Sequence, residues 1–274
     1  MNKILIISDI GRKIGLGHYV RAKVISEEIN FFFKKTFKIY NLFFNIGDEY
    51  KKIIKVKYLS KFDYLKKEIL KIDPDLIFLN NSKIFEKKFS KRILKFLNLN
   101  CKNKIIISID SYIKYHNKIN HVWIPNVVLN KKFKHKKNIY FGWDKLIIQR
   151  NKIKKNYKNK NLLFSTGGAD KYELIKRLPF FLKPVENFFN IHCLIGPYSK
   201  IPKSTKLQKI RYIKNIKNIK FLNKFNFGFV TFGVSFFEFV HNKILVVAYI
   251  PKNKEESLLI NFLKKKGFIV CTEN

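Results

Sequence analysis

The chain has 274 residues, of which 46% are hydrophobic and 16% aromatic, a composition that excludes an intrinsically disordered protein. Its length predicts two domains of roughly 100 to 150 residues each. The formal net charge of +38 arises from 57 basic residues, and only six of these are arginine.

The positive charge is carried mainly by lysine, which is spread over nearly every segment and accompanied by abundant asparagine, isoleucine, phenylalanine and tyrosine. This composition is typical of drift in an AT-rich genome. We favour drift over a dedicated nucleic-acid surface, although clustered cations do bind phosphates, and we do not expect a nucleic-acid partner. A third explanation is weak attraction to an anionic membrane surface.

The three cysteines, Cys101, Cys193 and Cys271, lie far apart and form no C-x-x-C pair, which favours free thiols in a reducing cytoplasm. The first apolar run is too short for a signal peptide. No run approaches the roughly 18 apolar residues that a transmembrane helix needs. We therefore expect a cytoplasmic protein that is soluble or peripheral.

The first half of the chain alternates apolar runs with amphipathic segments. It opens with a strand over residues 4–7, a glycine turn and a helix that reaches about Phe33. Strands over 37–43, 53–56, 76–79 and 105–110 and helices over 64–72 and 84–97 follow. This alternation predicts a parallel sheet covered on both faces.

The same alternation restarts after a polar, basic stretch over 149–160, which we interpret as a solvated linker. Strands are predicted over 162–165, 191–195, 228–231, 244–249 and 268–270, and helices over 172–182, 234–241 and 255–265. The fold class is therefore α/β, with two Rossmann-like domains over residues 1–148 and 161–274. Ligands bind at the carboxyl ends of parallel strands, so we expect the glycine turns to face a shared cleft.

The opening glycine turn places His18 at the mouth of a helix, after Gly15 and Gly17. Unpaired N–H groups at a helix start attract anions such as diphosphates. A histidine at this position can take a proton from water near neutral pH. Packing glycines and a capping or surface histidine remain the structural alternative.

A second glycine turn, with Gly167, Gly168 and Asp170, follows the first strand after the linker. Its small residues let backbone N–H groups approach a phosphate. A tight turn with a capping aspartate explains the same residues equally well.

Ser235 and Glu238 stand three residues apart, which is the spacing of a capping box and slightly favours a structural role. The functional alternative places Glu238 on the two hydroxyls of a ribose. The remaining histidines show no spacing with cysteines or carboxylates that indicates a metal site.

Taken together and in order, these motifs resemble the PseG/SpsG family. Residues 15–21, G-L-G-H-Y-V-R, are similar to the G-x-G-H-x-x-R opening of that family, and residues 167–170, G-G-A-D, to its G-G-T-D turn. Ser235 and Glu238, followed by Ser257, resemble its C-terminal nucleotide-binding segment. Residues 263–268 resemble the C-terminal end of the family sequence. The resemblance implies the two-domain GT-B fold of MurG-like glycosyltransferases.

The resemblance also implies hydrolysis of a UDP-linked 2,4-diacetamido-2,4,6-trideoxy sugar of pseudaminic acid-type biosynthesis, without metal or cofactor. His18 would activate water, UDP would leave into donors at Gly167 and Gly168, and Glu238 would hold the ribose. The implied substrate-binding residues are Gly15, Gly17, Arg21, Arg150, Gly167, Gly168, Asp170, Ser235, Glu238 and Asn253.

The chain departs from the family pattern at several positions. Residues 80–82, N-N-S, replace a D-H-Y triplet, Asp110-Ser111 replaces paired aspartates, and the family arginine before the linker falls at Gln149 or Arg150. Residues 253–255 replace an Asn-Gln pair, and a helix before the strand at Phe229 is predicted to be missing. Two alternatives therefore stay open, a GT-B glycosyltransferase with a membrane-associated acceptor and a basic nucleic-acid-binding protein without catalysis.

Overall fold

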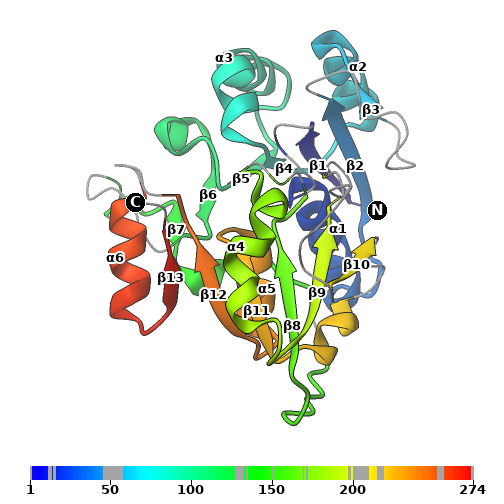
Figure 1. Cartoon of the computed structure of the whole chain (residues 1–274). Helices are drawn as coiled ribbons and strands as arrows, with labels where there is room; N and C mark the ends of the chain where they lie inside the picture. The colour runs from blue at the N-terminus through cyan, green and yellow to red at the C-terminus, as the bar shows by residue number, and fades with distance from the viewer. Residues whose placement is uncertain are drawn as a thin grey trace. The chain divides into compact units, whose positions relative to one another are not determined.

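The computed structural model divides into two compact units, Met1–Ile147 and Ile148–Asn274 (Figure 1). The structure describes residues 2–11, 14, 17–45, 58–126, 133, 135–149, 151–168, 170, 172–196, 199, 210–214, 219–251 and 256–272. Each unit is an α/β structure built on its own parallel sheet.

Unit 1 contains a seven-stranded sheet in the order β3-β2-β1-β4-β5-β6-β7. Its first strand is buried along almost its whole length, as a parallel strand covered on both faces must be. Each pairing in the sheet is parallel. The strands are β1 (Lys3–Ile10), β2 (Lys38–Asn45), β3 (Tyr58–Leu59), β4 (Leu76–Asn80), β5 (Ile105–Ile109), β6 (His121–Ile124) and β7 (Ile139–Phe141).

The helices of unit 1 are α1 (Gly17–Phe32), α2 (Phe62–Ile72) and α3 (Lys83–Asn100), with 3-10 turns η2 (Ile113–Lys118) and η4 (Trp143–Lys145). Side chains of α2 and α3 pack with Leu5 and Ile7 of β1 in one buried cluster. The crossovers through α1 and α3 run in opposite directions across the sheet. Right-handed connections therefore place α1 on the face opposite α3.

Unit 2 contains a six-stranded sheet in the order β10-β9-β8-β11-β12-β13, again with parallel pairings. Phe164 and Phe229 stack at its centre, with ring centroids 5.0 Å apart. The strands are β8 (Asn161–Ser165), β9 (Asn190–Ile195), β10 (Ile210–Lys214), β11 (Phe227–Thr231), β12 (Leu245–Tyr249) and β13 (Ile269–Cys271). The helices are α4 (Leu178–Leu182), α5 (Val234–His241) and α6 (Ser257–Lys265), with 3-10 turns η5 (Leu174–Arg177), η6 (Lys183–Val185) and η7 (Ile219–Lys224).

The α/β class and the alternation of elements in both halves are confirmed, and several details differ from the prediction. Residues 172–182 do not form one helix, because η5 ends at Arg177 and α4 begins anew with Pro179 in its first turn. The 3-10 turn η7 precedes β11, where no helix was expected. The strands β6, β7 and β10 were not predicted, and the strand expected over 53–56 lies outside the described residues.

The basic stretch before β8 is attached to unit 2. The ammonium group of Lys155 donates to the carbonyl oxygens of Leu222 (2.9 Å) and Phe225 (2.5 Å). The Asn226 amide donates to the Asn156 carbonyl at 2.7 Å. Burial lowers the pKa of Lys155 to about 8, so the interpretation of the whole stretch as a solvated charge run is wrong at this residue. None of the helices in the described part of the chain has the length and apolar character needed to cross a bilayer.

Candidate functional site

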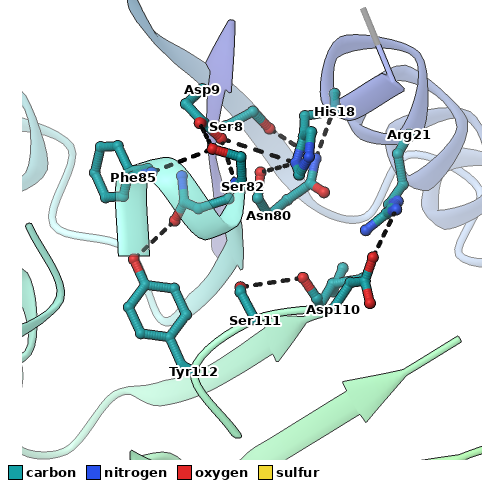
Figure 2. Close-up of polar contacts among 12 residues, drawn as sticks. Ser8, Asp9, His18, Arg21, Asn80, Ser82, Phe85, Asp110, Ser111 and Tyr112 are labelled. Carbon is teal, nitrogen blue, oxygen red and sulfur yellow. Dashed lines mark hydrogen bonds and ion pairs between the residues drawn. The ribbon is translucent and has the colours of Figure 1, made fainter. Parts of the chain in front are cut away.

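The candidate site of unit 1 lies where β1, β4 and β5 end (Figure 2). The ends of neighbouring parallel strands meet at one edge of the sheet, which is where ligands bind in open α/β sheets. Strand β1 supplies Asp9, β4 ends at Asn80, and Asp110 follows β5. Helix α1 begins at Gly17 and adds His18 and Arg21 to the same edge.

The orientation of the His18 ring is set by its Nδ1 atom. This atom lies 3.0 Å from the carbonyl oxygen of Asn80 and 3.8 Å from Oδ1 of Asp9. A carbonyl oxygen can only accept a hydrogen bond, so Nδ1 carries the proton and Nε2 of the neutral ring keeps its lone pair. The His18 ring is therefore held in the tautomer that a general base requires.

Burial also keeps His18 neutral. Desolvation lowers its pKa below the ordinary value of 6.5, and the positive charge of Arg21 acts in the same direction. The carboxylates of Asp9 and Asp110 and the Asn80 carbonyl partly oppose this effect. At neutral pH the unprotonated imidazole is thus the dominant form.

Asp9 is fully buried and is held by Ser82. One of its carboxylate oxygens accepts from the Ser82 amide at 2.7 Å, and the other accepts from the Ser82 hydroxyl. The Ser82 oxygen itself accepts from the Phe85 amide at 3.2 Å, which makes Ser82 the N-cap of α3. A single serine therefore positions both the start of α3 and the carboxylate beside His18.

Several polar groups of the triplet at residues 80–82 have partners within unit 1, although Oδ1 of Asn80 and Nδ2 of Asn81 have none among the described residues. The Asn80 amide donates to the His18 carbonyl and to the Ser8 hydroxyl, both at 2.8 Å. The Tyr112 hydroxyl donates to Oδ1 of Asn81 at 3.1 Å, and burial raises the pKa of Tyr112 well above 10.0. Tyr112 is fully buried, so its hydroxyl is not available to a ligand.

Arg21 is a buried cation with unused hydrogen-bonding capacity. Its side chain is 8% exposed, and Nη2 lies 3.6 Å from Oδ2 of Asp110, which is 44% exposed. The Nη1 atom has no hydrogen-bond partner among the described residues. A buried guanidinium nitrogen in this state can bind an anionic or carbonyl oxygen of a ligand.

The glycine turn of unit 2 follows β8. Gly167 has a φ of +77°, a left-handed conformation that favours glycine. A Cβ atom on Gly196 would lie 2.3 Å from the Gly167 carbonyl oxygen and 2.5 Å from that of Gly168. The end of β9 therefore packs directly on the turn and fixes its backbone.

Asp170 serves this turn by capping. Its two carboxylate oxygens accept from the amides of Leu174 (2.9 Å) and Ile175 (3.2 Å), at the start of η5. Burial raises the pKa of Asp170, and the two amide hydrogen bonds partly offset this rise. The structural alternative, a capping aspartate, is confirmed by these contacts.

The capping-box interpretation of Ser235 and Glu238 is wrong. Helix α5 begins at Val234 with Gly233 as its N-cap, so Ser235 lies inside the helix and the first turn has no side-chain cap. Burial raises the pKa of Glu238 from 4.5 to about 7. A carboxyl group that is desolvated to this extent and has no capping role is a candidate for binding a ligand.

Gly15, Arg150 and Asn253 lie outside the described residues. Sequence reasoning missed Asn80 and Ser82 as parts of the His18 environment, and it assigned no site role to Asp9 or Asp110. The common signal is a polar residue at the end of each of three neighbouring strands. No group of three or more histidine, cysteine, aspartate or glutamate side chains within the described part of the chain could hold a metal ion.

No protein-family model matches the chain. Among curated proteins, an uncharacterized protein of Methanocaldococcus jannaschii is 29% identical over 216 residues, and the match covers 71% of this chain and 43% of that protein. The chain thus spans less than half the length of this relative.

Solved structures match the chain over most of its length. The UDP-GlcNAc 2-epimerase from Neisseria meningitidis bound to UDP-GlcNAc has a TM-score of 0.57 at 11% identity, with coverage of 94% of this chain and 85% of that chain. A UGT protein of Arabidopsis thaliana complexed with quercetin also has a TM-score of 0.57, at 12% identity and 99% and 85% coverage. An alpha-glucosyltransferase in complex with UDP and a 13-mer DNA reaches 0.53 at 14% identity, with 91% and 80% coverage. The chain has the GT-B type of fold, built from two Rossmann-like domains.

Proposed function

We propose that this protein is an enzyme that acts on a UDP-sugar, and specifically a hydrolase that releases UDP. The observation that carries the proposal is the orientation of His18, whose Nδ1 is fixed by the Asn80 carbonyl so that Nε2 is the basic atom. Two structures of the same fold contain UDP or UDP-GlcNAc, which supports a nucleotide-sugar as the ligand. The motif resemblance favours a UDP-linked 2,4-diacetamido-2,4,6-trideoxy sugar.

In the proposed reaction, Nε2 of His18 removes a proton from a water molecule as the water oxygen attacks the anomeric carbon. The bond between this carbon and the diphosphate oxygen breaks, and its electron pair leaves with UDP. Asp9, 3.8 Å from Nδ1, stabilises the imidazolium that forms. The unpaired Nη1 of Arg21 is available for an oxygen atom of the sugar.

Unit 2 would bind the nucleotide. The α5 start has no side-chain cap, so amides of its first turn would bind phosphate oxygens together with the backbone of the turn at Gly167 and Gly168. Glu238 would accept the two ribose hydroxyls, and Ser235 and Asn253 would complete the nucleotide pocket. Asp170 would act on the nucleotide through the turn, because its two oxygens accept hydrogen bonds from the amides that follow it.

The main alternative is a GT-B glycosyltransferase, because a base at His18 can deprotonate an acceptor hydroxyl as readily as water. Release of UDP from a UDP-sugar in the absence of any acceptor supports the hydrolase. Turnover that begins only when an acceptor is added supports the transferase.

The first experiment is a thermal-shift screen with UDP, UDP-N-acetylglucosamine and UDP-diacetamido sugars, followed by an assay of UDP release. A ligand that binds only the native state raises the unfolding temperature. The proposal predicts stabilisation by UDP and UDP release from one of the sugars. Absence of both, together with tight and steeply salt-dependent binding of DNA or RNA, would support the nucleic-acid-binding alternative instead.

A further inference from the structure

A cluster of exposed aromatic side chains lies at the C-terminal end of α1. Phe31, Phe32 and Phe33 are 68%, 61% and 52% exposed. Phe31 and Phe32 pack edge to face with ring centroids 5.5 Å apart, and Phe33 packs in the same way on Phe37 at 5.2 Å. We call these four residues the aromatic tip. Large apolar side chains that gather on a surface mark an interaction site more often than scattered ones do.

Helix geometry explains why the core does not cover the tip. Consecutive helical residues point about 100° apart, so three phenylalanines in a row cannot all face one sheet. The buried residues of α1 are confined to positions 21–25, before its last two turns. Lys34 and Lys35, with φ values of 46° and 62°, then end the helix and return the chain to β2. The last turn of α1 thus extends past the part that packs on the sheet.

Positive charge follows the aromatic tip along the chain, whereas the preceding turn of α1 carries the carboxylates of Glu27 and Glu28. Residues 29–38 contain three lysines, Lys34, Lys35 and Lys38, and no carboxylate. All three lysines are exposed. Apolar rings edged with ammonium groups match the boundary between headgroups and acyl chains in a membrane that contains anionic lipids.

We propose that the aromatic tip and these three lysines bind unit 1 to the surface of an anionic phospholipid membrane. The phenylalanine rings enter the headgroup boundary, and the lysines contact lipid phosphates. Helix α1 has 16 residues and is therefore about 24 Å long. Because His18 lies at its other end, membrane binding leaves the candidate site uncovered and does not require the proposed hydrolysis.

The first test is sedimentation with vesicles of phosphatidylcholine, with and without phosphatidylglycerol, at physiological ionic strength. We expect binding only to the vesicles that contain phosphatidylglycerol. The variant with Phe31, Phe32 and Phe33 replaced by serine should bind at least roughly tenfold more weakly. The matched control replaces Phe180 and Phe188, which are 75% and 65% exposed in unit 2, by serine and should bind like the wild type.

Charge is tested separately with Lys34→Asn and Lys35→Asn together, because asparagine tolerates the left-handed backbone of both positions. We expect binding to be roughly 20-fold weaker, from about fivefold per lysine near the surface. Replacing the exposed Lys87 and Lys88 of α3 by glutamine removes the same charge elsewhere. An equal loss of vesicle binding in the two double variants would show that overall charge alone holds the protein on the vesicle, and would overturn the proposal.

Insertion is tested by the Phe32→Trp variant, which keeps an aromatic residue at the tip. Its additional fluorescence should shift to shorter wavelength on anionic vesicles, whereas that of a Phe180→Trp control should not. An unchanged spectrum, or a serine variant of the tip that binds like the wild type, would overturn the proposal. UDP release should be the same with and without vesicles, so failure of membrane binding is distinguishable from failure of the proposed hydrolysis.

Discussion

Replacing Ser82 by alanine should destabilise unit 1 far more than an ordinary buried serine-to-alanine change. The Ser82 oxygen accepts from the Phe85 amide at the start of α3, and its hydroxyl donates to the buried carboxylate of Asp9. Alanine removes both contacts at once and leaves Asp9 with one fewer donor. The Ser82 amide, which also donates to Asp9, is kept.

The expected magnitude follows from these two contacts. Loss of an N-cap costs about 1 kcal/mol. Loss of a hydrogen bond to a charged group costs about 1.5–3 kcal/mol. The free energy of unfolding should therefore fall by about 2.5–4 kcal/mol in the Ser82→Ala variant.

Urea unfolding followed by tryptophan fluorescence measures this change in the right unit, because both tryptophans, Trp123 and Trp143, lie in unit 1. The matched control is Ser90→Ala on the same helix. Ser90 is buried and donates to the Tyr115 hydroxyl at 3.1 Å, so its loss should cost about 0.5–1.5 kcal/mol. If the two variants unfold at the same urea concentration with equal slopes, the double role of Ser82 is refuted.

Three further predictions concern unit 2 and the effect of pH. Gly196→Ala should weaken UDP binding measured by calorimetry and lower the unfolding temperature, because its Cβ would lie 2.3 Å from the Gly167 carbonyl oxygen. Gly17→Ala, whose Cβ would meet nothing within 4 Å, is the control for the unfolding temperature. The folded pKa of Glu238, about 7, exceeds the ordinary 4.5, so the wild type loses stability as pH rises through 7. Glu238→Gln avoids this loss and should raise the free energy of unfolding at pH 8 by up to ~3 kcal/mol. Near pH 4 the same variant should leave the free energy of unfolding unchanged. The same variant should lose UDP affinity, and full affinity would contradict a role on the ribose. The folded pKa of His18 lies below 6.5. The stability contributed by His18 and the kcat/KM should therefore be at their maximum above pH 6.5, and both should fall only as pH drops through the folded pKa. A kcat/KM that already falls above pH 6.5 would contradict a lowered pKa of His18.

The alternating apolar runs were sufficient to predict most of the fold, because each long buried strand or amphipathic helix has a recognisable pattern of apolar residues in its own segment. Helix α5 begins and ends at the predicted residues. The strands β6, β7 and β10 have three to five residues and lie at or next to sheet edges, where burial is incomplete and the apolar signal is weak. Their positions depend on pairing with neighbours that are distant in the sequence.

The candidate site was predictable only in part. The position of His18 after a glycine turn gave its place at the sheet edge, but the tautomer depends on the Asn80 carbonyl, which is 62 residues away. The role of Ser82 likewise depends on Asp9, 73 residues earlier in the chain. A capping box was expected at Ser235 because its spacing to Glu238 matches, yet Gly233 is the N-cap and Ser235 lies inside the helix. The geometry of the site thus depends on contacts between residues that are distant in the sequence, which local spacing does not predict.

The most direct test of the proposed function compares UDP release by the wild type and by His18→Asn. The asparagine amide can keep the hydrogen bond to the Asn80 carbonyl but supplies no basic nitrogen. Its counterpart is His192→Asn in unit 2, which removes a histidine whose pKa is also lowered by burial. We predict that His18→Asn binds UDP like the wild type and loses UDP release by about 10²–10⁴-fold, while His192→Asn retains it. Full release by His18→Asn would contradict the assignment of His18 as the general base.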